Sequence, residues 1–254
     1  MKKFLKFLGI ILLLIVAVGF ILFLIYDEEL PEGDQGQEAT ELATEMASAI
    51  NFDAWEKTRF VHWKFEDVHE YWWDKKTQIV KAQWGETTVF LHTPSQTGSA
   101  LRSGKHLEGN EKEEAIQKAI GYFNNDSFWL NGPAKSISAA DRFAVVEVEE
   151  GRGLLTTFKS GGSTPGDSYL WILNEDGLPT SCKLWVSVIP VGGIKNKIVE
   201  WETLETGAKI PVRQKLGPME VNITDLSSAP LEMSPEIRNN DIFEGLNLNE
   251  SNYE

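Results

Sequence analysis

The sequence predicts an α+β protein, mainly β. We expect a curved antiparallel sheet that forms an unclosed half-barrel, with two main helices over its concave face, preceded by one transmembrane helix. Three observations predict this fold class: an uncharged apolar run near the N-terminus, two segments with apolar residues at helical spacing, and many short aromatic and β-branched runs with a period of two. A twisted sheet of about ten strands tends to curl, and two helices cover only one face of it.

Residues 1–26 are predicted to be a transmembrane anchor. Lys2, Lys3 and Lys6 precede a run without charged residues at 7–26, and acidic residues follow it. At a helical rise of about 1.5 Å per residue, this run spans roughly 30 Å, the thickness of one hydrocarbon core. The lysines place the N-terminus in the cytoplasm, so we expect a single-pass protein of the bacterial inner membrane with its domain in the periplasm.

A cleaved signal peptide is the alternative interpretation of this segment. Ala17 and Gly19 are small residues of the kind found at cleavage sites, but the apolar run continues beyond them, which favours an uncleaved anchor. Cys182 is the only cysteine, so the chain forms no internal disulfide and has no early cysteine for lipid attachment. This favours a bacterial envelope protein over a cysteine-rich ectodomain.

The charge of the chain excludes one class of partner. The net charge is −14, and the three lysines of the anchor contribute +3, so the remainder carries −17. Nucleic acids are bound through clustered lysine and arginine side chains. We therefore expect no nucleic-acid partner.

Residues 38–227 are predicted to form one domain, which a polar linker at 27–37 separates from the membrane. Apolar residues at helical spacing predict an amphipathic helix over 38–50. The period then changes to two, which predicts four strands in the runs "TRFVHWKF", "VHEYWWD", "QIVKAQW" and "TTVFLHT".

A second helix is expected to follow this first meander. Asn110 suits an N-cap, Glu113 completes a capping box, and the polar residues 124–126 are expected to end the helix. Its apolar stripe consists of Ala115, Ile116, Ala119, Ile120 and Phe123. Six further strand-like runs lie between 142 and 226, and the turns between them predict an antiparallel meander. The acidic, asparagine-rich residues 228–254 predict a disordered tail.

The order of the predicted helices and strands, together with three sequence segments, resembles that of a known family. The segments are "DSFWLNGPAKS" (126–136), "GGSTPGDSYLWIL" (161–173) and "LWVSVIPVGG" (184–193). The chain resembles the LolA-like superfamily of periplasmic lipoprotein carriers, and within it an uncharacterised, membrane-anchored family of bacterial envelope proteins. The resemblance implies an unclosed barrel whose apolar concave face holds acyl chains or other hydrophobic ligands under the helices. Because a transmembrane segment tethers this chain, a local receiver, presenter or sensor is favoured over a shuttling carrier.

No motif in the sequence predicts catalysis. The chain contains no G-x-S-x-G, no H-E-x-x-H and no phosphate-binding loop with its lysine. Cys182 alternates with Leu184 in an expected strand, so we interpret it as a core thiol. The four histidines match no zinc-ligand spacing. We therefore expect no enzyme activity, no cofactor and no metal.

The aromatic residues carry the functional hypothesis. In the stretch 69–74, alternation places Tyr71 and Trp73 on one face of a strand and Trp72 on the other. More tryptophans than one core requires suggest a lined cavity or an external apolar patch. The candidate ligand-binding residues, chosen by parity and by the resemblance, are Tyr71, Trp73, Phe128, Trp129 and Trp171.

We expect a membrane-anchored extracytoplasmic domain that binds a hydrophobic or lipid-like molecule, or an acyl chain, in lipid or lipoprotein handling. Two alternatives remain open. One is a protein-interaction or sensory ectodomain with a filled core, which would have an envelope protein as its partner. The other is an enzyme whose polar cluster the linear sequence hides.

Overall fold

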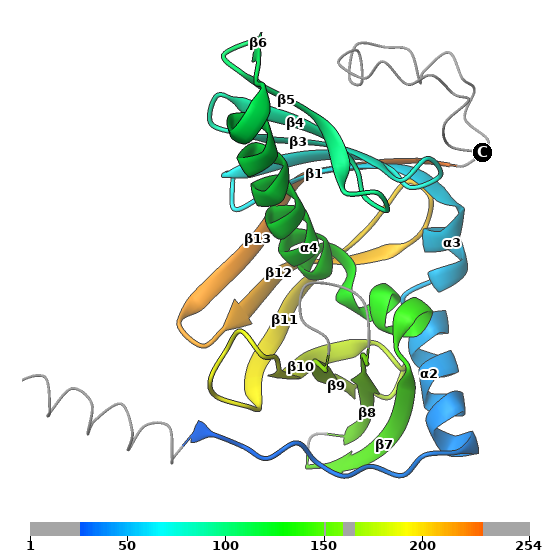
Figure 1. The fold of residues 1–254 in the computed structure, drawn as a ribbon. Helices are drawn as coiled ribbons and strands as arrows, with labels where there is room; N and C mark the ends of the chain where they lie inside the picture. The colour runs from blue at the N-terminus through cyan, green and yellow to red at the C-terminus, as the bar shows by residue number, and fades with distance from the viewer. Residues whose placement is uncertain (1–25, 150, 160–165, 231–254) are drawn as a thin grey trace, which may run out of the picture.

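The computed structural model describes residues 26–149, 151–159 and 166–230. Within them, a 13-stranded antiparallel sheet curves around the helices and remains open at both edges (Figure 1). This confirms the predicted mainly β architecture with an unclosed, curved sheet. The predicted anchor, apart from Tyr26, lies outside the described residues.

Sixteen elements follow one another along the described chain. The helices are α2 (Gln37–Ala49), α3 (Phe52–Lys57) and α4 (Gly109–Ala139). The strands before α4 are β1 (Thr58–Phe65), β2 (His69–Asp74), β3 (Ile79–Trp84), β4 (Thr87–His92), β5 (Thr97–Arg102) and β6 (Lys105–His106). Those after it are β7 (Arg142–Val148), β8 (Gly151–Thr157), β9 (Ser168–Leu173), β10 (Pro179–Trp185), β11 (Ile194–Thr203), β12 (Lys209–Leu216) and β13 (Met219–Pro230).

Two meanders make up the sheet, in the order β6-β5-β4-β3-β2-β1-β13-β12-β11-β10-β9-β8-β7. Strands that are consecutive in sequence pair with each other, except β6 and β7, which lie at the two edges of the sheet. The two meanders are joined by the pairing of β1 with β13. Register shifts interrupt the β1–β13, β9–β10 and β11–β12 pairings. Such bulges increase local twist and bend the strands, which is how so long a sheet curls instead of lying flat.

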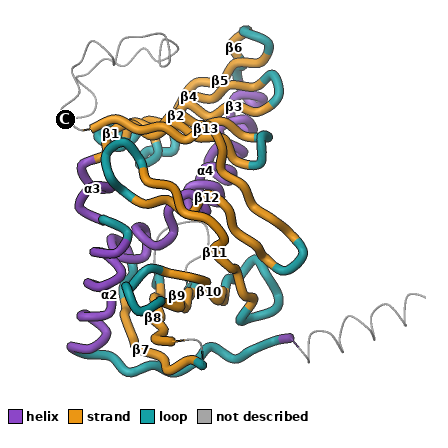
Figure 2. The backbone as a smooth tube through the Cα atoms, turned by 180° about the vertical axis from the view of Figure 1, so that it is seen from behind, coloured by secondary structure: helices purple, strands orange, loops and turns teal. Residues whose placement is uncertain are grey.

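The helices lie on the concave side of the sheet. Figure 1 shows α4 crossing from the first meander to the second, and the view from behind in Figure 2 shows the strands on the opposite side. Helix α4 contacts β4, β5 and β12, whereas α2 packs on β7 and β8. The first meander and α4 enclose one core, whose residues include Trp63, Tyr71, Val80, Val89, Ile116, Ala119 and Phe123. A second core lies between α2 and the second meander and includes Leu42, Met46, Leu154, Tyr169, Trp171 and Cys182.

The predicted strand count was too low, because β5, β6 and β12 were missed. Strand β5 contains Gly98, a residue that weakens strand propensity. The glycine is required there, since a Cβ would lie 1.9 Å from the Phe90 carbonyl oxygen. Strand β12 contains Pro211, which removes a ladder donor and obscures the strand pattern.

The predicted limits of the second helix were wrong. Glu108, not Asn110, is the N-cap residue of α4, and no side chain caps it. The polar residues 124–126 do not end the helix, because Asp126 is buried and hydrogen-bonded to the sheet. The helix continues to Ala139 across a break at Asn131. The short helix α3 was also missed.

The predicted parity of the tryptophan-rich strand β2 is confirmed. Tyr71 is fully buried, and Trp73 packs on the first core. Trp72 lies on the convex face, where its ring stacks on His62 at 4.9 Å and lies 4.3 Å from the Lys81 ammonium. The surplus tryptophan therefore forms a small surface stack.

The segment expected to be a linker contacts the second meander. The Trp185 indole donates to the Glu28 carbonyl at 2.7 Å, Lys183 pairs with the Glu28 carboxylate at 2.6 Å, and Asp34 forms a β-bridge with Val145. The expected tail begins within β13, and its residues 231–254 lie outside the described residues. In the part of the chain that the structure describes, no helix is long and apolar enough to span a membrane.

Candidate ligand pocket

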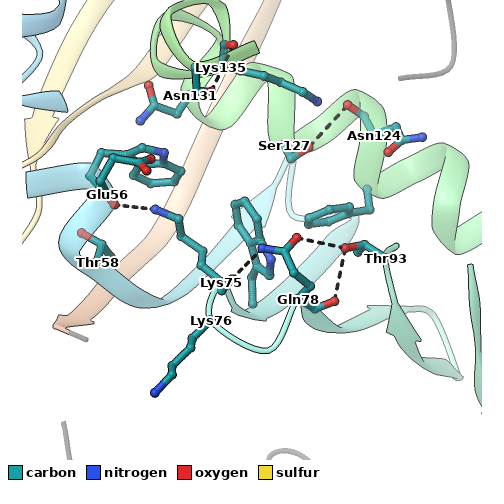
Figure 3. A pocket seen from close by; sticks show the side chains of 14 residues that line it. Glu56, Thr58, Lys75, Lys76, Gln78, Thr93, Asn124, Ser127, Asn131 and Lys135 are labelled. Atoms are coloured by element: carbon teal, nitrogen blue, oxygen red, sulfur yellow. Dashed lines mark hydrogen bonds between the residues drawn. The ribbon is translucent and has the colours of Figure 1, made fainter. Parts of the chain in front are cut away.

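A pocket of about 410 Å³ opens between the break in α4, helix α3 and the β2–β3 turn (Figure 3). We call it the α4 pocket. Its volume falls within the roughly 300–1,000 Å³ typical of small-molecule sites. The lining residues are Trp55, Glu56, Thr58, Trp73, Lys75, Lys76, Gln78, Thr93, Phe123, Asn124, Ser127, Asn131, Lys135 and Ser138.

Three aromatic rings form the apolar part of the lining. Trp73 comes from the inward face of β2, Trp55 from α3 and Phe123 from the apolar stripe of α4. The Trp73 ring lies 6.1 Å from that of Trp55 and 5.3 Å from that of Phe123, in tilted and edge-on arrangements. These geometries are favourable for aromatic pairs. The sheet, α3 and α4 therefore converge on one apolar wall.

The β2–β3 turn places Lys75 in the pocket. The Asp74 carboxylate accepts hydrogen bonds from the Lys76 and Thr77 amides at 3.0 and 3.4 Å, which shapes the turn. The Lys75 ammonium then lies 3.9 Å from the centre of the Trp55 ring and donates to the Trp55 carbonyl. Burial lowers the pKa of Lys75 to about 8, and the carboxylate of Glu56 opposes this shift.

The Lys75 titration predicts a pH-dependent stability. The folded chain releases this proton near pH 8, whereas the unfolded chain retains it up to about 10.5. Between these values the unfolded state binds more protons, so the Lys75 contribution to the free energy of unfolding rises with pH. We expect the free energy of unfolding of Lys75→Met, relative to that of wild type, to be higher at pH 7 than at pH 10. Urea unfolding at both pH values measures this, and a constant difference would contradict it.

A break in α4 positions Lys135. Asn131 has φ −152° and ψ 59°, and its side-chain oxygen accepts the Ala134 amide at 3.3 Å, so the helix restarts there. Gly132 permits the close approach of the sheet, because a Cβ would lie 3.0 Å from the Trp171 ring. Lys135 falls in the first turn of the restarted helix. Burial lowers the pKa of Lys135.

A buried polar cluster fastens α4 to β2 beside the pocket. The Asp126 carboxylate of α4 accepts a hydrogen bond from the Tyr71 hydroxyl at 2.7 Å and lies 2.7 Å from His69 Nδ1. The His69 ring stacks on Tyr122 at 4.1 Å. Burial, together with the charge of Asp126, raises the pKa of Tyr71. These contacts join α4 to β2.

The structure separates the five candidate ligand-binding residues. Trp73 lines the α4 pocket. Tyr71 lies in the first core and binds Asp126, while Phe128 and Trp171 pack in the second core, where the Trp171 indole donates to Ser136 at 2.9 Å. Trp129 is half-buried, and its carbonyl accepts from Gln214. These four lie outside the lining of the α4 pocket.

The pocket residues that sequence reasoning missed include Trp55 and Phe123 of the apolar wall and the two lysines, Lys75 and Lys135. Lys75 belongs to a polar turn, and Lys135 follows a glycine and a proline that mask the helical pattern. A helix restart after an asparagine N-cap is a recognisable signal, and "NGPAK" carries it. No local signal reveals that these two lysines line one pocket.

Cys182 is buried in the second core, as predicted, and burial raises the pKa of its thiol. Across residues 26–149, 151–159 and 166–230, no three histidine, cysteine, aspartate or glutamate side chains form a metal-ligating group.

Comparison with protein-family models and with curated proteins finds no match for this chain.

Proposed function

We propose that this chain is a membrane-tethered, extracytoplasmic domain that binds a lipid-like amphiphile in the α4 pocket without catalysing a reaction. The observation that carries the proposal is the pocket itself, which measures about 410 Å³ and lies between the sheet and α4. Its aromatic wall suits an apolar chain, because burial of apolar surface contributes about 25 cal/mol per Å². Its polar side suits a head group.

The fold supports the LolA-like part of this proposal. An open antiparallel sheet with a helix across its concave face is the architecture that the resemblance implies. The N-terminal apolar run would keep such a domain at the inner membrane, with the domain in the periplasm, where it would receive or present an acyl chain locally. An interaction domain with a filled interior predicts no such pocket, so the cavity favours ligand binding.

Filling the pocket is expected to abolish binding. The probe is a fatty acid with a photoreactive diazirine and an alkyne, added to the full chain in nanodiscs of zwitterionic lipid. Ser127 lines the pocket from α4, so Ser127→Trp places an indole where the chain would lie. We expect this variant to lose most of the saturable labelling, measured in gels after coupling to a dye.

Lys118→Trp is the matched control, because Lys118 lies on the same helix but is exposed and outside the pocket. This variant should label like wild type. Circular dichroism verifies that both variants are folded. Equal labelling of a folded Ser127→Trp variant and of wild type would overturn the proposed function.

A further inference from the structure

The charges of the α4 pocket are opposite to those of the domain around it. The chain outside the anchor carries −17, yet the lining contains three lysines and one glutamate. Glu56 is exposed at the rim, as is Lys76, whereas Lys75 and Lys135 are half-buried. A local excess of positive charge inside an acidic domain attracts anions to this pocket.

Lys135 is the least compensated of these charges. Its ammonium makes no hydrogen bond and no ion pair within the described part of the chain. It also lies in the first turn after the break at Asn131, where the helix dipole is unfavourable for a cation. A buried charge without a partner destabilises the fold. An anion in the pocket would relieve the effects of both the burial and the dipole.

Lys75 supplies a second cation on another wall of the pocket. One of its three donors is used by the Trp55 carbonyl, and the ring of the same tryptophan covers one side of the ammonium. Glu56 is the one carboxylate that acts on its pKa, and this side chain is exposed. Lys75 therefore retains donor capacity for a ligand.

We propose that the ligand is a single apolar chain with an anionic head group, a carboxylate or a phosphate, whose charge is bound by Lys135, while Lys75 adds to the positive potential of the pocket (Figure 3) and the chain lies against Trp55, Trp73 and Phe123. This inference rests on the proposed function and specifies its ligand class. The pocket volume, near the lower end of the range for small-molecule sites, suits one chain.

Head-group competition tests the inference. The full chain in zwitterionic nanodiscs is labelled with photoreactive probes of one chain length that end in a carboxylate, a phosphate or an alcohol. We expect wild type to reach half-saturation at an about tenfold lower concentration of at least one anionic probe than of the alcohol, as one added hydrogen bond to a charged group would give. Preference for either anion supports the proposal.

The variants test whether this preference comes from Lys135. In Lys135→Gln, the ratio of the half-saturating concentration of the alcohol probe to that of the anionic probe should fall close to one. Lys135→Arg should retain most of the wild-type ratio, and the exposed control Lys118→Gln should leave the ratio unchanged. Equal half-saturation by all three probes in wild type, with labelling still lost in Ser127→Trp, would overturn the inference and leave the proposed function standing. If no probe labels the pocket, both fail. An unchanged preference in folded Lys135→Gln would also overturn the inference.

Discussion

Replacing Asp74 with alanine is expected to lower the free energy of unfolding by about 3–5 kcal/mol, the range for breaking a buried ion pair. Arg59 and Asp74 are almost fully buried, and the guanidinium donates to both carboxylate oxygens at 3.1 and 3.0 Å. The variant leaves the Arg59 charge buried without a counter-ion. It also removes the acceptor that shapes the turn carrying Lys75. Urea unfolding followed by tryptophan fluorescence measures the loss.

Two comparisons test the cause of this loss. Glu220→Ala removes an acid that pairs with Arg213 and Lys215 at the surface, and it should change stability by less than about 1 kcal/mol. The double variant Arg59→Met with Asp74→Leu removes both charges and should recover part of the stability lost in Asp74→Ala. An Asp74→Ala loss no larger than that of Glu220→Ala would contradict this account.

Replacing Asp126 with alanine is expected to destabilise the chain by about 3 kcal/mol or more, because it leaves buried partners unsatisfied. Asp126 is 1 % exposed, and it is the shared partner of Tyr71 and His69. Its loss leaves the Tyr71 hydroxyl buried without its acceptor and loosens α4 from β2. Urea unfolding gives the stability, and photolabelling below the unfolding transition reports whether the α4 pocket persists.

Tyr71→Phe provides the graded comparison, since it removes one donor and leaves the His69–Asp126 contact in place. We expect it to lower the free energy of unfolding by about 1–2 kcal/mol. If Asp126→Ala is no more destabilising than Tyr71→Phe, the carboxylate is not the centre of the cluster.

Local sequence patterns predict the sheet well where inward and outward residues alternate along a strand, as the inward position of Trp73 shows. They fail where long-range contacts override local preference. Asp126 belongs to a polar run typical of a helix end, but Tyr71, 55 residues earlier, makes it part of a buried cluster within α4. Such a partner is invisible in a local window, so the helix was predicted to be too short.

The candidate site is less predictable than the fold for the same reason. The alternation of side chains along β2 identifies Trp73 as an inward residue. It cannot identify Lys75 or Lys135, because a turn brings the first to the pocket and a helix restart brings the second. Face parity also groups Trp171 with the ligand-binding residues, although Ser136 and Phe128 enclose it in the second core. Which inward rings line a cavity depends on the path of α4, and the break at Asn131 sets that path.

The site of attachment of the photoreactive fatty acid shows whether the ligand occupies the α4 pocket. The full chain is labelled in nanodiscs and digested, and the modified residues are mapped by mass spectrometry. We expect saturable labelling in the peptides that carry Trp55, Trp73 and the α4 residues from Phe123 to Lys135, with loss of these modifications in Ser127→Trp. Labelling confined to residues 1–26, or to surface residues outside the α4 pocket, would contradict this expectation.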